Sequence, residues 1–194
     1  MVCRHEGRTR YGASVSTYAA FLRGMNVGGH RISNEELRAV FTDMGLADVR
    51  TFRASGNVIF ASEREPLAEL LLRIEEGLGS ALGYAVPTFL REAGEVRTIA
   101  AHRPFEPAVV EASAGKLQVA LLAEPPSAAA RGSVLALASE QDRLALVGRE
   151  LYWLPSGGML DSGLDMKAIA GALGAMTMRT KATIELIAEK HLAG

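Results

Sequence analysis

The sequence is poor in the residues that build covalent or metal-linked structure. Cys3 is the only cysteine among 194 residues, so neither an intramolecular disulfide nor a cysteine-rich metal site can form, and a reducing, cytoplasmic setting is the default. The four histidines are scattered, without the i, i+3 or i, i+4 spacing of a helix-borne zinc site. The sequence therefore predicts neither a metal nor a cofactor.

Long apolar runs and an excess of one charge are also missing. No uncharged stretch reaches the length that spans a membrane, and residues 1–16 lack the apolar core of a secretory signal. We interpret residues 1–16 as a loose N-terminal extension and predict no membrane association. The formal net charge is −1, whereas a generic nucleic-acid binder is usually basic. Bulk nucleic acid is therefore disfavoured as a partner.

Two runs of elements in the same order are present. Periodicity of the apolar residues predicts strand, helix, strand, strand, helix and strand within residues 17–93, and the same order again from residue 116. We therefore predict an α+β protein of two ferredoxin-like (β-α-β-β-α-β) α-β plait units with antiparallel sheets. The units are residues 17–93 and 116–194, joined by a connecting segment at 94–115, and the second ends in a closing C-terminal helix.

Local signals mark helix starts and one tight turn. Ser33 with Glu36 has the spacing of a capping box, and so does Ser162 with Asp165. In the run Ser55-Gly56-Asn57, glycine occupies the first central position of a two-residue turn. A type II′ turn needs a positive φ at that position, so the run predicts such a turn. These signals fix where the predicted helices and the first hairpin begin.

The predicted strands are apolar on both faces. In residues 18–22 and 151–154, apolar side chains occupy successive positions, although a strand with one face in water alternates apolar and polar residues. The open sheet faces are therefore predicted to be covered. The cover is another sheet, the segment 94–110, or a second copy in a homodimer.

The segment Arg23–Arg31 is the most unusual part of the chain, with three glycines, two arginines and a histidine directly before a predicted helix. Glycine amides and helix N-termini bind anions, and arginines add fork-shaped donors. The same residues also suit a rigid turn in which Asn26 binds its own backbone, and Gly and Asn are what a hairpin turn requires sterically. The predicted ligand-binding residues are Arg23, Asn26, Gly28, Gly29, Arg31, Ser55 and Asn57.

Three motifs together resemble a bacterial family catalogued as domain of unknown function 1697. They are RGMNVGG at 23–29, SGNVIF at 55–60 and GRELYWLPSGG at 148–158. Their order and spacing fit nearly the whole chain. The resemblance implies a two-unit α-β plait and no established activity.

The chain departs from the family pattern at several positions. Members often carry Arg-Asn-Trp-Asn-Thr near the C-terminus, where Arg179 and Thr183 are kept here. The replaced positions are Thr180, Lys181 and Ala182 within that run, Ala54 in place of a glutamine, and Gly163 in place of a lysine. Roles of the missing side chains are not carried over. The positions that keep the family pattern in the two loops are Arg23, Asn26, Gly28, Gly29, Ser55 and Asn57.

The favoured function is binding of a phosphorylated or other anionic small molecule at the glycine loop. One alternative is an enzyme acting on a nucleotide or nucleic-acid-derived substrate, which requires His30 or Asp161 as an acid or base near the same cleft. Another is a protein-protein interaction module that uses an apolar sheet face. No complete catalytic signature is present, so no catalytic residue is assigned and enzymatic activity stays open.

Overall fold

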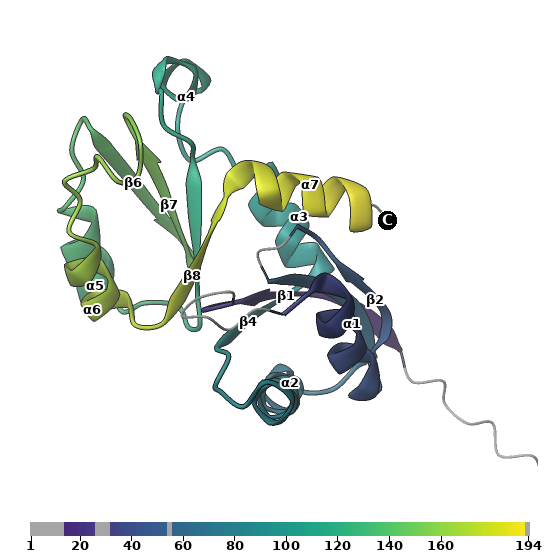
Figure 1. Ribbon diagram of the computed structural model, residues 1–194. Helices are drawn as coiled ribbons and strands as arrows, with labels where there is room; N and C mark the ends of the chain where they lie inside the picture. The colour runs from purple at the N-terminus through teal and green to yellow at the C-terminus, as the bar shows by residue number, and fades with distance from the viewer. Residues whose placement is uncertain (1–13, 26–31, 54–55, 193–194) are drawn as a thin grey trace, which may run out of the picture.

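The framework of the molecule is a pair of four-stranded antiparallel sheets (Figure 1). The structure is a computed structural model that describes residues 14–25, 32–53 and 56–192. The first unit consists of β1 (Val15–Leu22), α1 (Asn34–Asp43), β2 (Ala47–Thr51), β3 (Asn57–Glu63), α2 (Leu67–Leu82) and β4 (Thr88–Glu92). Its strands lie in the order β2-β3-β1-β4.

The second unit repeats this arrangement. It consists of β5 (Gln118–Leu122), α5 (Ala128–Leu135), β6 (Asp142–Val147), β7 (Glu150–Pro155), α6 (Met166–Leu173) and β8 (Met176–Thr180). The strand order β6-β7-β5-β8 places each strand where its counterpart lies in the first sheet. The prediction of an α+β protein with two ferredoxin-like α-β plait units is confirmed.

Three further helices lie outside the repeated pattern: α3 (Ala93–Ala101), α4 (Pro107–Ala112) and α7 (Lys181–His191). The closing helix was predicted from the sequence, whereas residues 94–115 were predicted only as a connecting segment. A sequence signal for α3 exists, because Glu92 and Glu95 form a capping box at its start. The interpretation of residues 17–93 and 116–194 as separate domains stays a prediction.

Each pair of plait helices covers one face of its own sheet. In the first unit, Phe41 of α1 and Ile74 of α2 pack on Tyr18 and Phe60, whose rings stack with centroids 5.7 Å apart. In the second unit, Val134 of α5 and Ile169 of α6 join the apolar residues of β5 and β7. These two clusters form the cores of the two units, and burial of their apolar surface is the main source of stability.

A third core fills the space between the two sheets. Phe21 and Phe89 of the first sheet meet Tyr152 of the second, together with Val96 of α3 and Ile184 of α7. Figure 1 shows α7 lying over the first sheet with α3 beside it. The prediction of covered faces is confirmed, and the cover comes from the same chain. These faces are therefore unavailable as the interaction surface of a protein-protein module.

Of the two predicted capping boxes, the structure contains the one at Ser33 and lacks the one at Ser162. At α1 the Glu36 amide donates to Ser33 Oγ at 3.1 Å and the Ser33 amide donates to Glu36 Oε2 at 2.8 Å, as predicted. The prediction at Ser162 was wrong. Because α6 begins only at Met166, Asp165 is itself the cap and accepts from the Ala168 amide at 2.8 Å.

The prediction of a two-residue turn in the first hairpin was also wrong. The register pairs Thr51 with Val58, so six residues separate the last paired positions. The Phe52 amide donates to the Asn57 carbonyl at 2.9 Å and closes this longer loop. Both Arg53 (φ 57°) and Gly56 (φ 66°) take the left-handed conformation that the reversal requires. The longer loop carries Arg53 out towards the second unit, where its guanidinium meets Thr183.

Candidate ligand site at the junction of the two units

The end of β1 and the β2–β3 hairpin lie against each other. The Leu22 amide donates to the Gly56 carbonyl at 2.8 Å, and a Cβ at position 56 would lie 3.0 Å from Leu22 Cβ. Only glycine combines this close approach with a positive φ at low cost. The Arg23 amide donates to the Pro87 carbonyl at 2.9 Å. The chain therefore leaves β1 at a fixed position beside the hairpin.

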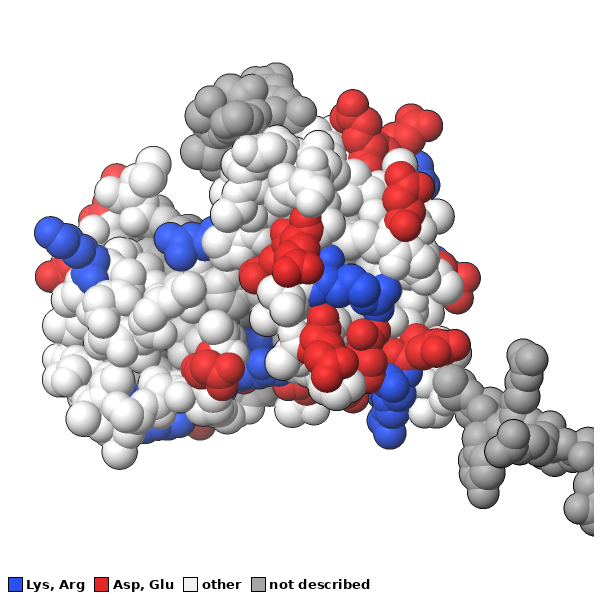
Figure 2. All heavy atoms as spheres, turned by 90° about the horizontal axis from the view of Figure 1, so that it is seen from below, with Lys and Arg blue, Asp and Glu red and all other residues white. Residues whose placement is uncertain are grey.

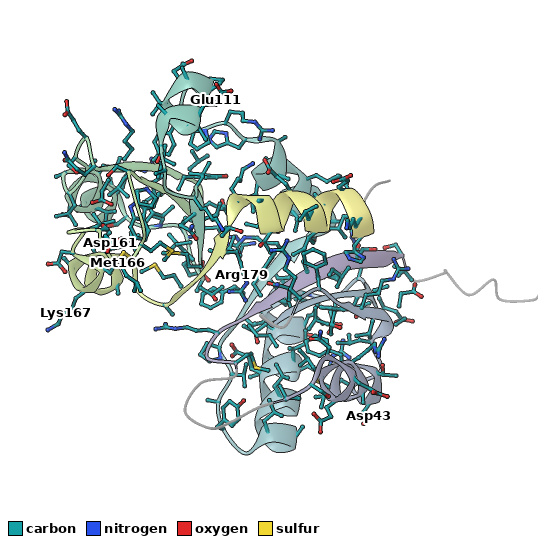
Figure 3. All side chains as sticks on the ribbon, turned by 45° about the horizontal axis from the view of Figure 1, so that its top comes forward. Asp43, Glu111, Asp161, Met166, Lys167 and Arg179 are labelled. Atoms are coloured by element: carbon teal, nitrogen blue, oxygen red, sulfur yellow. The ribbon has the colours of Figure 1, made fainter. Side chains whose placement is uncertain are left out.

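Arg179 of β8 ties this part of the first unit to the second. Its Nη2 donates to the Leu22 carbonyl at 2.8 Å and to the Gly56 carbonyl at 3.3 Å, and its Nε donates to Asn57 Oδ1 at 2.6 Å. In Figure 3, Arg179 lies where β8 runs along the first unit. We call Leu22, Arg23, Gly56, Asn57 and Arg179 the junction site.

The charge of Arg179 is retained at neutral pH. Partial burial lowers the pKa of its guanidinium to about 10, which is still well above 7. The carbon at the centre of the guanidinium lies 5.9 Å from the centroid of the Phe21 ring, within the range of a cation–π contact. A partly buried cation is therefore held at the ends of both loops.

The residues predicted to bind the ligand differ in their surroundings. Arg23 is exposed, and its side chain makes no hydrogen bond or ion pair within the described part of the chain. Asn57 is buried, and its amide bridges Arg179 and the Phe52 carbonyl, so its described contacts build the junction. The predicted residues Asn26, Gly28, Gly29, Arg31 and Ser55 lie outside the described residues, as does His30.

Arg179 and Thr183, the two residues that the resemblance implies are kept near the C-terminus, both contact the hairpin. Arg179 binds Asn57 and Gly56, and Thr183 Oγ1 accepts from Arg53 Nη1 at 3.4 Å. The three replaced positions, Thr180, Lys181 and Ala182, line a cavity of about 590 Å³ beside that contact. Sequence reasoning did not include Arg179 or Arg53 among the site residues, although the retained motif residue Arg179 was a usable signal.

The cavity lies between the hairpin, the α3–α4 connection, α4, and the start of α7, and we call it the α4–α7 cavity. Its lining residues are Arg53, Arg103, Pro104, Phe105, Pro107, Val110, Glu111, Lys116, Leu117, Thr180, Lys181, Ala182 and Glu185. Four of these are cationic and two are carboxylates. Figure 3 labels Glu111 on α4, which projects away from the sheets.

A second arginine links the units at β4, an edge strand of the first sheet. Arg91 of β4 is fully buried, and its Nε donates to Glu150 Oε1 at 2.8 Å while its Nη2 donates to the Leu122 carbonyl at 2.9 Å. Arg149 beside it pairs with Glu95 at 2.7 Å. Desolvation is the main cause that lowers the pKa of Arg91. This ion-pair network is a structural contact between β4, α3 and the β6–β7 hairpin.

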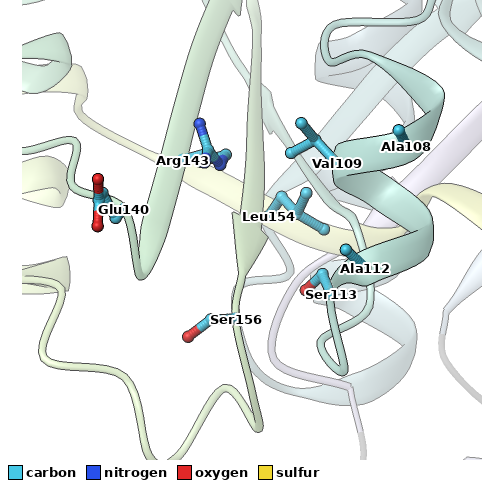
Figure 4. A pocket seen from close by; sticks show the side chains of 8 residues that line it. All are labelled: Ala108, Val109, Ala112, Ser113, Glu140, Arg143, Leu154 and Ser156. Carbon is cyan, nitrogen blue, oxygen red and sulfur yellow. The ribbon is translucent and has the colours of Figure 1, made fainter.

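Two smaller hollows in the second unit lack a comparable arrangement. The pocket of about 320 Å³ in Figure 4 has Arg143 and Glu140 on the strand side, across from the apolar residues of α4. Another, of about 170 Å³, contains Asp161 beside Ser162. Asp161 therefore lines a different hollow from the junction site, and the condition set for the enzyme alternative is not met by it.

The surface charge of the described residues is mixed in sign. On the face in Figure 2, acidic and basic side chains are interspersed over the first unit, without a continuous basic surface. Within the described residues, no three His, Cys, Asp or Glu side chains gather where they could hold a metal ion. The helices of the described part are all too short or too polar to cross a membrane.

The fold defines a class of proteins made of two α-β plaits with a shared inter-sheet core, and comparison with known proteins agrees. The family described as "Protein of unknown function (DUF1697)" matches residues 15–152. The chain belongs to this family. A conserved bacterial protein from Streptococcus pneumoniae has a similar structure, with a TM-score of 0.68, 19% identity, and coverage of 91% of this chain and 98% of that one. At this identity the likeness shows the fold alone. A search of curated proteins found no match.

Proposed function

We propose that this protein binds a phosphorylated or otherwise anionic small molecule at the junction site. The observation that supports it is the placement of the Arg179 guanidinium, which fixes the ends of β1 and the hairpin directly beside the exposed Arg23. A cation held in a partly buried position attracts anions more strongly than one in water.

In this proposal Arg23 contacts the ligand and Arg179 positions the backbone. Arg23 follows Leu22 without a break, and the Leu22 carbonyl accepts from Arg179, so the side chain of Arg23 starts from a fixed point. Asn26, Gly28, Gly29 and Arg31 follow in the same loop of the sequence and Ser55 precedes Gly56 in the other. Their amide and guanidinium donors complete the proposed contact with the anion.

The test is a thermal-shift screen of the full chain against inorganic phosphate, nucleotides and sugar phosphates. A ligand at about 100 times its dissociation constant adds about 2.7 kcal/mol, which raises Tm by about 5 to 10 °C for a chain of this size. We expect Arg23→Ala to weaken that shift severely, because a charge-assisted hydrogen bond contributes about 1.5 to 3 kcal/mol.

The matched control is Arg143→Ala, which removes an equal charge from β6, the far edge strand of the second sheet. Its ligand-induced shift should equal that of the unmodified protein. A flat screen, or equal loss in Arg23→Ala and Arg143→Ala, contradicts the proposal. In that case the glycine loop is a turn.

A further inference from the structure

We propose that the α4–α7 cavity is a second binding site, for a small amphiphilic anion that carries a carboxylate on an apolar body. This site is separate from the proposed anion contact at Arg23, which does not line the cavity. The inference rests on three properties of the cavity: its size and apolar wall, the charges that remain unpaired around it, and the fixed position of Arg53.

The size and the wall suit a small organic molecule. The volume of about 590 Å³ is within the usual range of ligand pockets. Phe105 and Leu117 line the cavity and also pack against the inter-sheet core, so this wall is supported from behind. Val110 of α4 adds apolar surface on the opposite element. A molecule without an apolar body would leave this surface in contact with water.

The lining charges are only partly used by the protein itself. Glu185 Oε1 is 2.8 Å from Lys181 Nζ and 3.3 Å from Arg103 Nη1, so one carboxylate pairs with two cations and offsets one of their two charges. Lys181 also donates to the Ala100 carbonyl at 2.6 Å. Burial is the main cause that lowers the pKa of its ammonium group. Lys181, Glu185 and Arg103 therefore mainly contact one another and the backbone, and we assign them no ligand contact.

Arg53 and Lys116 are the cations that can meet a ligand, and they outnumber the one other lining carboxylate, the exposed Glu111. Lys116 is exposed, and its side chain has no hydrogen bond or ion pair within the described residues. Arg53 is also exposed, and it donates to the uncharged hydroxyl of Thr183 while lying 5.4 Å from the Phe52 ring centroid. A guanidinium has further N–H groups, which can bind a carboxylate with two parallel hydrogen bonds.

The backbone conformation of Arg53 supports its assignment as a ligand-binding residue of the cavity. Its φ of 57° is uncommon for a residue with a side chain and costs of order 1 kcal/mol or more, so the surrounding structure maintains it. The hydrogen bond of 3.4 Å to Thr183 places the guanidinium beside the start of α7. The cavity thus combines an apolar wall with a positioned guanidinium and a free ammonium, which is the complement of an apolar carboxylate.

The proposal is tested by calorimetric titration of the full chain with naphthalene-2-carboxylate, its neutral analogue 2-naphthalenemethanol, and inorganic phosphate. We expect saturable binding of the carboxylate and at least 10-fold weaker binding of the alcohol. Lys116→Ala should weaken carboxylate binding about 5-fold or more without loss of fold, because its side chain is exposed. Val110→Asp should abolish it, because a carboxylate then faces the ligand.

The controls separate this site from the junction site. Lys167→Ala removes an exposed cation from α6 and should leave carboxylate affinity unchanged. Arg23→Ala should also leave it unchanged while reducing the response to phosphate. Equal binding of acid and alcohol, unchanged affinity in Lys116→Ala, or absence of saturable binding would each overturn the proposal. None of these three results would contradict the proposed anion contact at the junction site, which the thermal-shift screen tests separately.

Discussion

The two arginine contacts between the units differ in what they hold. Arg91 is fully buried between regular strands, and its charge is met by Glu150 at 2.8 Å in a network that includes Arg149 and Glu95. Arg179 is less buried and donates to the uncharged oxygens of Leu22, Gly56 and Asn57, which belong to strand ends and a loop. Two arginines therefore serve different purposes: Arg91 makes a rigid ion-pair contact at the edge strand β4, and Arg179 positions two loops at the ends of the central strands β1 and β3.

This difference separates a contact that maintains the fold from one that also shapes a site. A buried ion pair is costly to break because the remaining partner is left without its counter-charge. A guanidinium that organises carbonyls at loop ends fixes the backbone from which other side chains extend. We therefore expect the Arg91 contact to affect stability alone and the Arg179 contact to affect both stability and ligand binding.

The largest effect is expected from Arg91→Ala. The substitution leaves Glu150 without its partner and removes the donor to the carbonyl of Leu122 at the same edge. We expect a loss of about 3 kcal/mol or more in the free energy of unfolding, measured by urea denaturation. Arg143→Ala, which removes an exposed arginine, should change it by less than about 0.5 kcal/mol. A loss below 1 kcal/mol would place the inter-unit stability elsewhere.

A smaller loss is expected from Arg179→Lys. Lysine keeps the charge but cannot reach the Leu22 carbonyl and Asn57 Oδ1 with one planar fork. We expect a destabilisation of about 2 kcal/mol in urea, together with a weakened thermal response to phosphate. A double-mutant cycle with Asn57→Ala should show coupling, because the two side chains are 2.6 Å apart. Additive losses would show that this hydrogen bond contributes little.

The two hairpin glycines allow a finer comparison. Gly56 and Gly148 have similar φ values of 66° and 58°. A Cβ at position 56 would approach Leu22 Cβ to 3.0 Å, whereas a Cβ at 148 would meet only Glu150 Oε2, at 3.4 Å. Gly148→Ala should cost about 1 kcal/mol for the backbone alone, and Gly56→Ala about 2 kcal/mol or more. Equal losses by urea denaturation would mean that the close approach at the junction site relaxes freely.

The smallest effect concerns pH and His191 at the end of α7. Burial is the main cause that lowers the pKa of its imidazole, followed by the charges of Arg50 and Lys190. The folded state therefore binds fewer protons than the unfolded state, so stability falls as pH drops below the ordinary histidine value of about 6.5. His191→Gln should flatten the pH dependence of Tm between pH 7 and 5. An unchanged slope would assign that dependence to other groups.

Local patterns predicted more of the fold than of the candidate site. The periodic stripe on α2 and the capping box at α1 are formed by residues three or four positions apart, and both were readable. The hairpin after β2 was misjudged, because its length is set by the register of β2 against β3, which pairs Thr51 with Val58. The helix α3 was missed, because its buried apolar residues Val96 and Ile99 are explained mainly by the sheets they cover.

The sequence by itself determined the two plait units, the order of the elements within each, and the need to cover both faces of each sheet, since apolar periodicity acts between near neighbours. Tertiary structure decided what covers those faces and which side chains meet. Arg179 reaches Asn57 and Leu22 across 122 and 157 positions of the chain. Such partners are selected by the packing of whole sheets and helices, and no local pattern of residues specifies them.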